Sequence, residues 1–140
     1  ARGRVVDAAA EAAKLQASPE AFVLQAEIAK RSGDLAAALR LLEGAEQLAR
    51  KDGRGPVFRL DFVRGDALAR MERSNEAIAA YEREIAAFPN DLDAYAGLAI
   101  LHFVTGDRAA SERALQRLTD ANPTDRARAL AAKTRATLRE

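Results

Sequence analysis

The residue types that most often carry enzyme chemistry are scarce in this chain, and their spacing matches no catalytic pattern. His102 is the only histidine, and cysteine is absent. No serine lies in a G-x-S-x-G sequence, which would present a nucleophile on a sharp turn, and a general base needs such a partner or a water beside it. We therefore expect His102 to be a packed or hydrogen-bonded core residue, and we predict no catalytic residue and no enzyme activity.

The residue spacing also disfavours a phosphate-binding loop, a metal site and a pair of catalytic acids. The Gly-rich segment 53–56 lacks the following Lys and Ser/Thr of a phosphate-binding loop, so it is interpreted as a flexible connection. No His pair, Cys cluster or calcium-loop spacing occurs. Glu82 and Glu84 are two positions apart on an expected helix, so they point to different faces and form no acid pair. The sequence predicts neither a cofactor nor a metal.

Charge and hydropathy limit the classes of partner. Basic and acidic residues number 22 and 21, for a net charge of +1, whereas a nucleic-acid binder usually has a basic excess or a basic face. Near the C-terminus a basic group is interpreted as a solvated helix face rather than a phosphate site: Arg126, Arg128, Lys133, Arg135 and Arg139. No apolar run is long enough to cross a bilayer as a helix, so no membrane span is predicted. The Arg-rich composition favours a bacterial source, with the cytoplasm and the periplasm both open.

An internal repeat organises the chain. Pro89 and Pro123 are separated by the same interval as Gly65 and Ala99. The pair Gly33-Asp34 recurs as Gly106-Asp107 after two such intervals and a short insertion, which matches the Gly-rich linker. The interval is a period of about 34 residues, and a unit of that length made of two helices is typical of the tetratricopeptide repeat.

Several motif positions resemble that family in a common register. They are Phe22, Ala38, Asn75, Ala77, Tyr81, Tyr95, Leu98, Ala99 and Leu115. The resemblance implies an all-α fold, a right-handed superhelix of antiparallel helix pairs with about eight helices. It divides the chain into 1–17 as the second helix of a truncated preceding repeat, repeats at 18–51, 58–91 and 92–124, a linker at 52–57, and a capping helix at 125–140. The chain is accordingly expected to be an excerpt of a longer protein.

Local signals place the ends of these helices. Ser18 is expected to cap a helix that has Pro19 at its first position, and Asp91 is expected to cap the helix 92–105 of the third repeat. Ser74 is expected to start a helix, and Gly106 to end one in a left-handed conformation. Four positions depart from the family pattern, namely Asp61, Arg64, His102 and Ser111. We therefore expect the first helix of the second repeat to sit somewhat differently from the others.

The resemblance also implies where a partner binds, because partners of this family usually lie against the first helices of the repeats. The matching positions are Glu20, Val23, Glu27, Lys30 and Arg31, then Arg59, Phe62, Asp66, Ala69 and Arg70, then Asp93, Ala96, Ile100, Phe103 and Val104. Phe62 and Phe103 are the expected aromatic anchors, with packing of Phe103 and Ile100 on the next helix as the alternative. Val23, Glu27, Asp66, Ala96 and Ile100 do not match the residues with which one subfamily grips a C-terminal carboxylate, so no such activity is predicted.

The leading interpretation is a non-catalytic scaffold that binds a protein or peptide in this concave groove. An accessory, substrate-recruiting domain of a larger bacterial enzyme is one alternative, because residues 84–99 resemble repeat tails of some bacterial hydrolases. Self-association through the N-terminal face is the other alternative. Neither nucleic acid nor a membrane span is predicted as part of the function.

Overall fold

The computed structural model of the chain describes residues 18–139. This part of the chain is entirely helical, with no strand. Its helices are α2 (Pro19–Arg31), α3 (Leu35–Lys51), α4 (Leu60–Arg70), α5 (Ser74–Ala87), α6 (Leu92–Val104), α7 (Arg108–Ala121) and α8 (Asp125–Arg139). The helix expected within residues 1–17 lies outside the described residues. The helices that are described match the all-α fold and the repeat pattern of the sequence.

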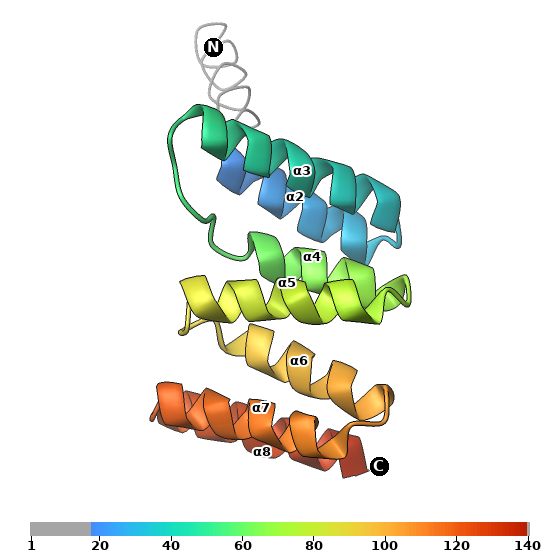
Figure 1. The fold of residues 1–140 in the computed structure, drawn as a ribbon, viewed down its shortest axis with the longest axis vertical. Coiled ribbons are helices and arrows are strands. Elements are labelled where there is room, and N and C mark those ends of the chain that lie inside the picture. Colours follow the sequence, from blue (N-terminus) through green and yellow to red (C-terminus); the bar gives the residue numbers. More distant parts are fainter. Residues whose placement is uncertain (1–17, 140) are drawn as a thin grey trace, which may run out of the picture.

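The helices form antiparallel pairs that stack one after another. Helix α2 packs on α3, α4 on α5, and α6 on α7, while α8 packs on both α6 and α7. Figure 1 shows the pairs following each other along the long axis of the molecule, with α2 and α3 at one end and α8 at the other. The first helices of successive pairs also touch, α2 with α4, α4 with α6, and α6 with α8. Those four helices therefore form one continuous row.

Most of the predicted helix ends are confirmed. Ser18 accepts a hydrogen bond from the amide of Ala21 at 3.1 Å, and Pro19 follows it at the first helical position. Gly106 has a φ of +95°, which a residue without a Cβ adopts easily. Helix α5 begins at Ser74, as expected. The prediction for Asp91 is wrong, because it occupies the cap position of α6 but its side chain makes no capping hydrogen bond.

The pairs approach closely because glycine and alanine line their contacts. A Cβ built on Gly65 of α4 would lie 2.8 Å from the ring of Tyr81, and a Cβ built on Gly97 of α6 would lie at the same distance from that ring. Tyr81 itself is 2% exposed. Its ring thus fills the space between two first helices, and neither helix has room for even a methyl group there.

The first helix of the second repeat differs from its neighbours, as the sequence departures predict. It starts at Leu60 after Arg59, which has a left-handed φ of 72°. Arg64 donates to Asp61 at 2.8 Å and to Glu46 of α3 at 3.1 Å. An ion-paired cluster therefore occupies the place where the family usually has bulky apolar side chains, and it links this helix to the preceding pair.

We predict that Gly65→Ala destabilises the fold by about 1–3 kcal/mol, because the added methyl overlaps a tyrosine ring that cannot move away from Gly97. Urea unfolding would measure the change. Gly44→Ala is the matched control, since a Cβ there meets only Phe22 at 4.0 Å and alanine is the better helix former by roughly 1 kcal/mol. Equal stabilities of the two variants would contradict the close approach.

Candidate functional site

Three cavities lie against the row of first helices, which we call the first-helix groove (α2, α4, α6 and α8). The largest, the N-terminal cavity, has a volume of about 600 Å³ and lies where α4, α6 and α8 begin. A central cavity of about 180 Å³ lies between α4 and α6. A C-terminal cavity of about 340 Å³ lies where α6 ends against α7 and α8. All three include positions that the sequence predicts for the groove.

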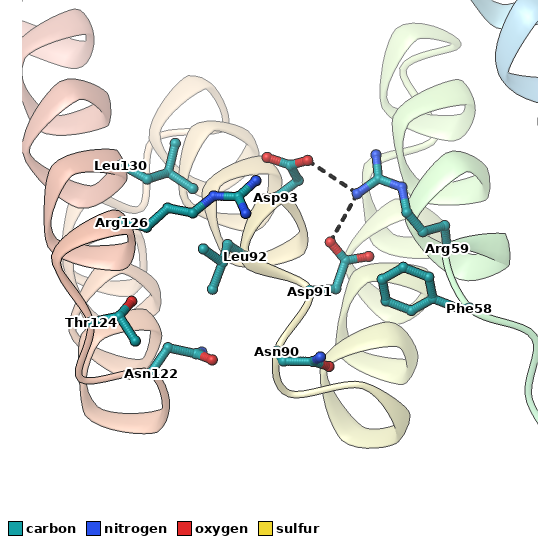
Figure 2. A pocket seen from close by; sticks show the side chains of 10 residues that line it. All are labelled: Phe58, Arg59, Asn90, Asp91, Leu92, Asp93, Asn122, Thr124, Arg126 and Leu130. Carbon is teal, nitrogen blue, oxygen red and sulfur yellow. Dashed lines mark hydrogen bonds and ion pairs between the residues drawn. The ribbon is translucent and has the colours of Figure 1, made fainter.

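Arg59 organises one wall of the N-terminal cavity. Its guanidinium donates to Asp91 at 3.0 Å and to Asp93 at 3.1 Å, as Figure 2 shows, and lies 3.6 Å from Glu27 of α2. Arg126 reaches into the same space from α8, opposite this wall. The cavity is completed by Phe58, Asn90, Leu92, Asn122, Thr124 and Leu130. It is thus a mixed surface in which most of the charge is already neutralised internally.

Behind that wall lies a pair of buried carboxyl groups. Glu84 is 1% exposed and accepts hydrogen bonds from the backbone amides of Arg59 at 3.0 Å and Phe62 at 3.3 Å. It therefore satisfies the amides at the start of α4, which no local side chain caps. Asp91 is 3% exposed, and its carboxyl group lies beside that of Glu84.

Two carboxyl groups buried side by side disfavour two negative charges, which raises the pKa of the pair. The Oδ2 atom of Asp91 is buried and has no hydrogen-bond partner among the described residues. Burial, together with the adjacent Asp91, raises the pKa of Glu84 from 4.5 to about 7, and burial raises the pKa of Asp91 as well. Oδ2 of Asp91 therefore lies on the inner side of the cavity wall, while Oδ1 faces Arg59.

A second polar network lies deeper in the groove and joins three helices. Lys30 of α2, which is buried, donates to Oδ2 of Asp66 on α4 at 2.7 Å. The hydroxyl of Tyr81 on α5 donates to Oδ1 of the same carboxylate. Burial and the negative charge of Asp66 raise the pKa of Tyr81, so the phenol keeps its proton and remains the donor. Arg70 adds a hydrogen bond to the carbonyl of Lys30 at 3.1 Å.

The structure corrects the expectation that Phe62 is an exposed anchor. Its side chain is 7% exposed. The guanidinium of Arg59 lies 4.2 Å from its ring centroid, the ammonium of Lys30 lies 5.3 Å from it, and the ring of Tyr81 packs beside it. Phe62 therefore separates the two polar networks and holds two cations against its ring faces. Its apolar surface is already buried by side chains of the same chain.

Two exposed aliphatic side chains border the central cavity. Ile100 and Val104 are one helical turn apart on α6 and are 42% and 69% exposed. They border a space whose other lining residues are Asp66, Ala69, Tyr81, Gly97 and Leu101. The alternative in which Ile100 packs away on the next helix is therefore wrong. The lining is apolar except for one carboxylate and one phenol.

Phe103 lies at the same end of α6, directly before Val104, and is half-buried in the wall of the C-terminal cavity. The guanidinium of Arg108 lies 5.2 Å from its ring centroid. Arg135 of α8 makes a two-pronged ion pair with Glu112 of α7, at 2.6 and 3.0 Å. Phe103 thus remains partly available to a partner, in contrast to Phe62.

The remaining predicted positions divide between core and surface. Val23 and Ala96 are buried. Glu27 is half-buried, and Arg31 and Arg70 are exposed at the open side of α2 and α4. His102 was expected to be a packed or hydrogen-bonded core residue, and its side chain is half-buried. The predicted groove positions therefore divide into those that hold the helices together and those that face outward.

Sequence reasoning missed the pairing of Glu84 with Asp91 and the exposure of Leu24 and Ile28. Glu84 follows Tyr81 by three positions, so it lies on the buried side of α5, and an acid at such a position needs a partner. That signal was present in the sequence. Asp91 is harder to recognise as that partner, because its position directly before α6 also fits a helix cap.

Two kinds of site are not found in the described part of the chain. Between residues 18 and 139, no three or more His, Asp or Glu side chains come together in a way that could hold a metal ion. Over the same range, none of the helices combines the length and the apolar character that a membrane crossing requires.

Comparison with known protein families gives one match. Residues 68–136 match a family model described as tetratricopeptide repeat. The matched range runs from the end of α4 through most of α8, and it contains most of the residues around the central and C-terminal cavities. No curated protein matches the chain.

We predict that the chain becomes less stable as the pH rises from about 5 to about 7.5. Glu84 keeps its proton in the folded state up to about pH 7, whereas the unfolded chain releases it near pH 4.5. The folded state therefore binds more protons in this window, and raising the pH favours unfolding, by about 1–3 kcal/mol.

Urea unfolding of the wild type and of Glu84→Gln at both pH values tests this expectation. The amide can accept from the backbone of α4 and donate to Asp91 without titrating, so the variant should lose most of the pH dependence. An unchanged slope in Glu84→Gln would assign the effect to other groups.

We also predict that Tyr81→Phe destabilises the chain by about 1.5–3 kcal/mol, because it removes a hydrogen bond to a charged acceptor. Tyr95→Phe is the matched control, since Tyr95 donates to the neutral carbonyl of Pro89 at 2.9 Å, and its loss should cost about 0.5–1.5 kcal/mol. Chemical unfolding would compare the free energies of unfolding of the two variants. A larger loss in Tyr95→Phe than in Tyr81→Phe would contradict the stabilising hydrogen bond between Tyr81 and the carboxylate of Asp66.

Proposed function

Because residues 68–136 belong to the tetratricopeptide repeat family, we propose that the chain is a protein-interaction module that binds a peptide segment of its partner along the first-helix groove. Repeats of this family generally bind proteins. The family match identifies no catalytic domain. We further propose that an aliphatic side chain of the partner enters the central cavity and packs on Ile100 and Val104.

The observation that carries this proposal is the pair of aliphatic side chains left uncovered beside a cavity. Ile100 and Val104 lie on one face of α6, with the small residues Ala69 and Gly97 beside them. Burying an aliphatic side chain contributes about 1.5–3 kcal/mol. A partner side chain that fills the cavity would bury these two residues as well as itself, so both surfaces contribute to binding.

The polar atoms around the cavity limit what fits there. Asp66 already accepts hydrogen bonds from Lys30 and Tyr81, so its charge is largely compensated. A partner group that brings a second carboxylate next to Asp66 would face repulsion in a partly buried site. The central cavity therefore favours an uncharged aliphatic side chain over an acidic one.

Phe103 and Arg108 extend the same surface toward the end of α6. The half-buried ring and the guanidinium near it offer an apolar face and a positive charge within one turn of Val104. A peptide that fills the central cavity would pass over them. We expect Phe103 to contribute to affinity, while Phe62 supports the fold.

We predict that Ile100→Asp/Val104→Asp lowers the affinity for peptides selected on the wild-type chain at least tenfold, which is about 1.4 kcal/mol. Selection from a random peptide library followed by titration calorimetry supplies both the ligands and the affinities. Because both residues are exposed, the variant should keep its helical circular dichroism and its unfolding midpoint.

Arg128→Ala/Lys133→Ala is the control, because these residues are exposed on α8 and line none of the three cavities. It should leave the affinity within about twofold. Binding that survives the groove variant would refute the proposal if it is lost on neutralising Arg126, Arg128, Lys133 and Arg135 and falls steeply with salt. That result would indicate an anionic partner.

A further inference from the structure

The C-terminal cavity is bordered by positive charge that the described residues do not neutralise. Figure 1 shows the end of α6, the beginning of α7 and the end of α8 at the same side of the stack, and these segments line the cavity. Arg108 of α7 and Arg139 of α8 are exposed at its border. Within residues 18–139 neither guanidinium makes an ion pair or a hydrogen bond, although that of Arg108 lies near the ring of Phe103. Both cations therefore lack a carboxylate partner in this part of the chain.

A third arginine shows that a carboxylate is stable in this space. Arg135 makes its two-pronged ion pair with Glu112 at the wall of the cavity. The hydrogen bond from Arg135, together with the positive charges of Arg135 and Arg139, lowers the pKa of Glu112. Three arginines against one glutamate leave the lining with two positive charges in excess. An anion is therefore attracted to the cavity.

A buried hydroxyl group lines the same cavity. Ser111 is 3% exposed, and its hydroxyl makes no hydrogen bond to another described residue. Ala38 of α3 and Ala77 of α5 occupy the corresponding positions of the earlier repeats and are fully buried. Packing of the helix pairs therefore does not require a hydroxyl at this position. A buried polar group without a partner is costly, whereas a ligand with an acceptor oxygen would satisfy it.

The cavity combines these donors with apolar surface. Its lining residues recur at intervals of three or four positions on two helices, which places them on one face of each helix. They are Arg108, Ser111 and Leu115 on α7, and Arg135, Leu138 and Arg139 on α8. The two leucines and Phe103 of α6 supply the apolar surface. This combination fits a side chain with an apolar stem and an anionic head, which is the character of glutamate.

The position of the cavity relates it to the proposed peptide path. Phe103 lines the C-terminal cavity, and Val104, the next residue of α6, lines the central cavity. An extended peptide advances about 3.3–3.6 Å per residue. A peptide that packs an aliphatic side chain on Val104 can therefore bring a residue a few positions away to the C-terminal cavity.

We propose that the C-terminal cavity binds the carboxylate of an acidic side chain of the partner peptide, with Arg108, Arg139 and Ser111 as the donors. The proposal rests on the peptide-binding function proposed for the groove and adds a sequence requirement to it. The peptide must carry an aliphatic residue for the central cavity and an acidic residue a few positions away. Among the residues that line this cavity, only Phe103 belongs to the groove positions predicted from the sequence.

Peptides selected from a random library on the wild-type chain test the proposal, because they should share an acidic residue at a constant spacing from an aliphatic one. Arg108→Gln/Arg139→Gln should lower the affinity for such a peptide about tenfold or more, since charge-assisted hydrogen bonds are lost. Ser111→Ala should lower it roughly two- to tenfold. Ser111→Ala should also keep its unfolding midpoint, because alanine fills the corresponding position of the other repeats.

Arg40→Gln/Arg113→Gln is the matched control. It removes the same charge from two exposed residues of α3 and α7 that line none of the three cavities. Titration calorimetry should find its affinity within about twofold of the wild type. A loss as large as that of Arg108→Gln/Arg139→Gln would assign the effect to the overall charge of the chain and would overturn the proposal.

A change in the peptide locates the contact. Replacing its acidic residue by the corresponding amide should weaken binding to the wild type about tenfold and should change binding to Arg108→Gln/Arg139→Gln little, because the charges that it would contact are already absent. Equal losses in the two chains would overturn the proposal. Phosphoserine in place of the acidic residue is the third arm. Binding more than tenfold tighter than that of the acidic peptide would assign the cavity to a phosphoryl group and would also overturn it.

The two proposals fail separately. Binding that is lost in Ile100→Asp/Val104→Asp but unchanged in Arg108→Gln/Arg139→Gln would leave the groove in place and reject the acidic subsite. Selected peptides without a recurring acidic residue would reject the subsite as well. Binding that is unchanged in Ile100→Asp/Val104→Asp but lost in Arg108→Gln/Arg139→Gln would reject the central cavity as the binding site and keep the carboxylate contact.

Discussion

The close fit of one tyrosine between two glycines sets the spacing of the stack. The ring of Tyr81 touches the backbone of α4 at Gly65 and the backbone of α6 at Gly97. With only 5% aromatic residues, the chain has few large side chains to fix the distance between helices. One buried ring therefore determines how the pair α4 and α5 meets the pair α6 and α7. Dispersion contacts on both sides of that ring stabilise the close approach.

Polar contacts then fix the register that the close packing allows. Alanine and leucine surfaces are smooth and would tolerate sliding, whereas a buried carboxylate is stable only where its donors are placed. Asp66 needs Lys30 from α2 and Tyr81 from α5, and Glu84 needs the amides at the start of α4. These requirements are met in one arrangement of the helices. A role of such groups in specifying the arrangement is well attested elsewhere, while their net contribution to stability is small.

The same contacts determine what the groove offers to a partner. Residues near the beginning of α4 and α6 are used internally, since Arg59 is held by Asp91, Asp93 and Glu27 and covers Phe62. Toward the end of α6 no such network forms among the described residues, and aliphatic side chains remain open beside the central cavity. The proposed binding surface therefore lies where aliphatic side chains of the groove are exposed. The charged residues at the other end mainly hold the helices in place.

The sequence alone determined the fold class and the repeat register. The repeat period, the helix-forming composition and local caps such as Ser18 are short-range features, so they can be read without knowing the contacts. It also predicted a partner-binding face, the first helices of the repeats, which stays a prediction. It could not decide which groove residues are exposed, because Phe62 and Phe103 are both aromatic residues on the first helix of a repeat and look alike in sequence.

Only the tertiary structure separated them. Phe62 is covered because Arg59, Lys30 and Tyr81 come from three different parts of the stack and meet around its ring. Likewise, Asp91 caps nothing locally and instead pairs with Glu84 and Arg59, which lie in other segments. Side-chain exposure and carboxyl protonation depend on neighbours distant in the sequence, and for that reason they followed from packing and not from the local pattern.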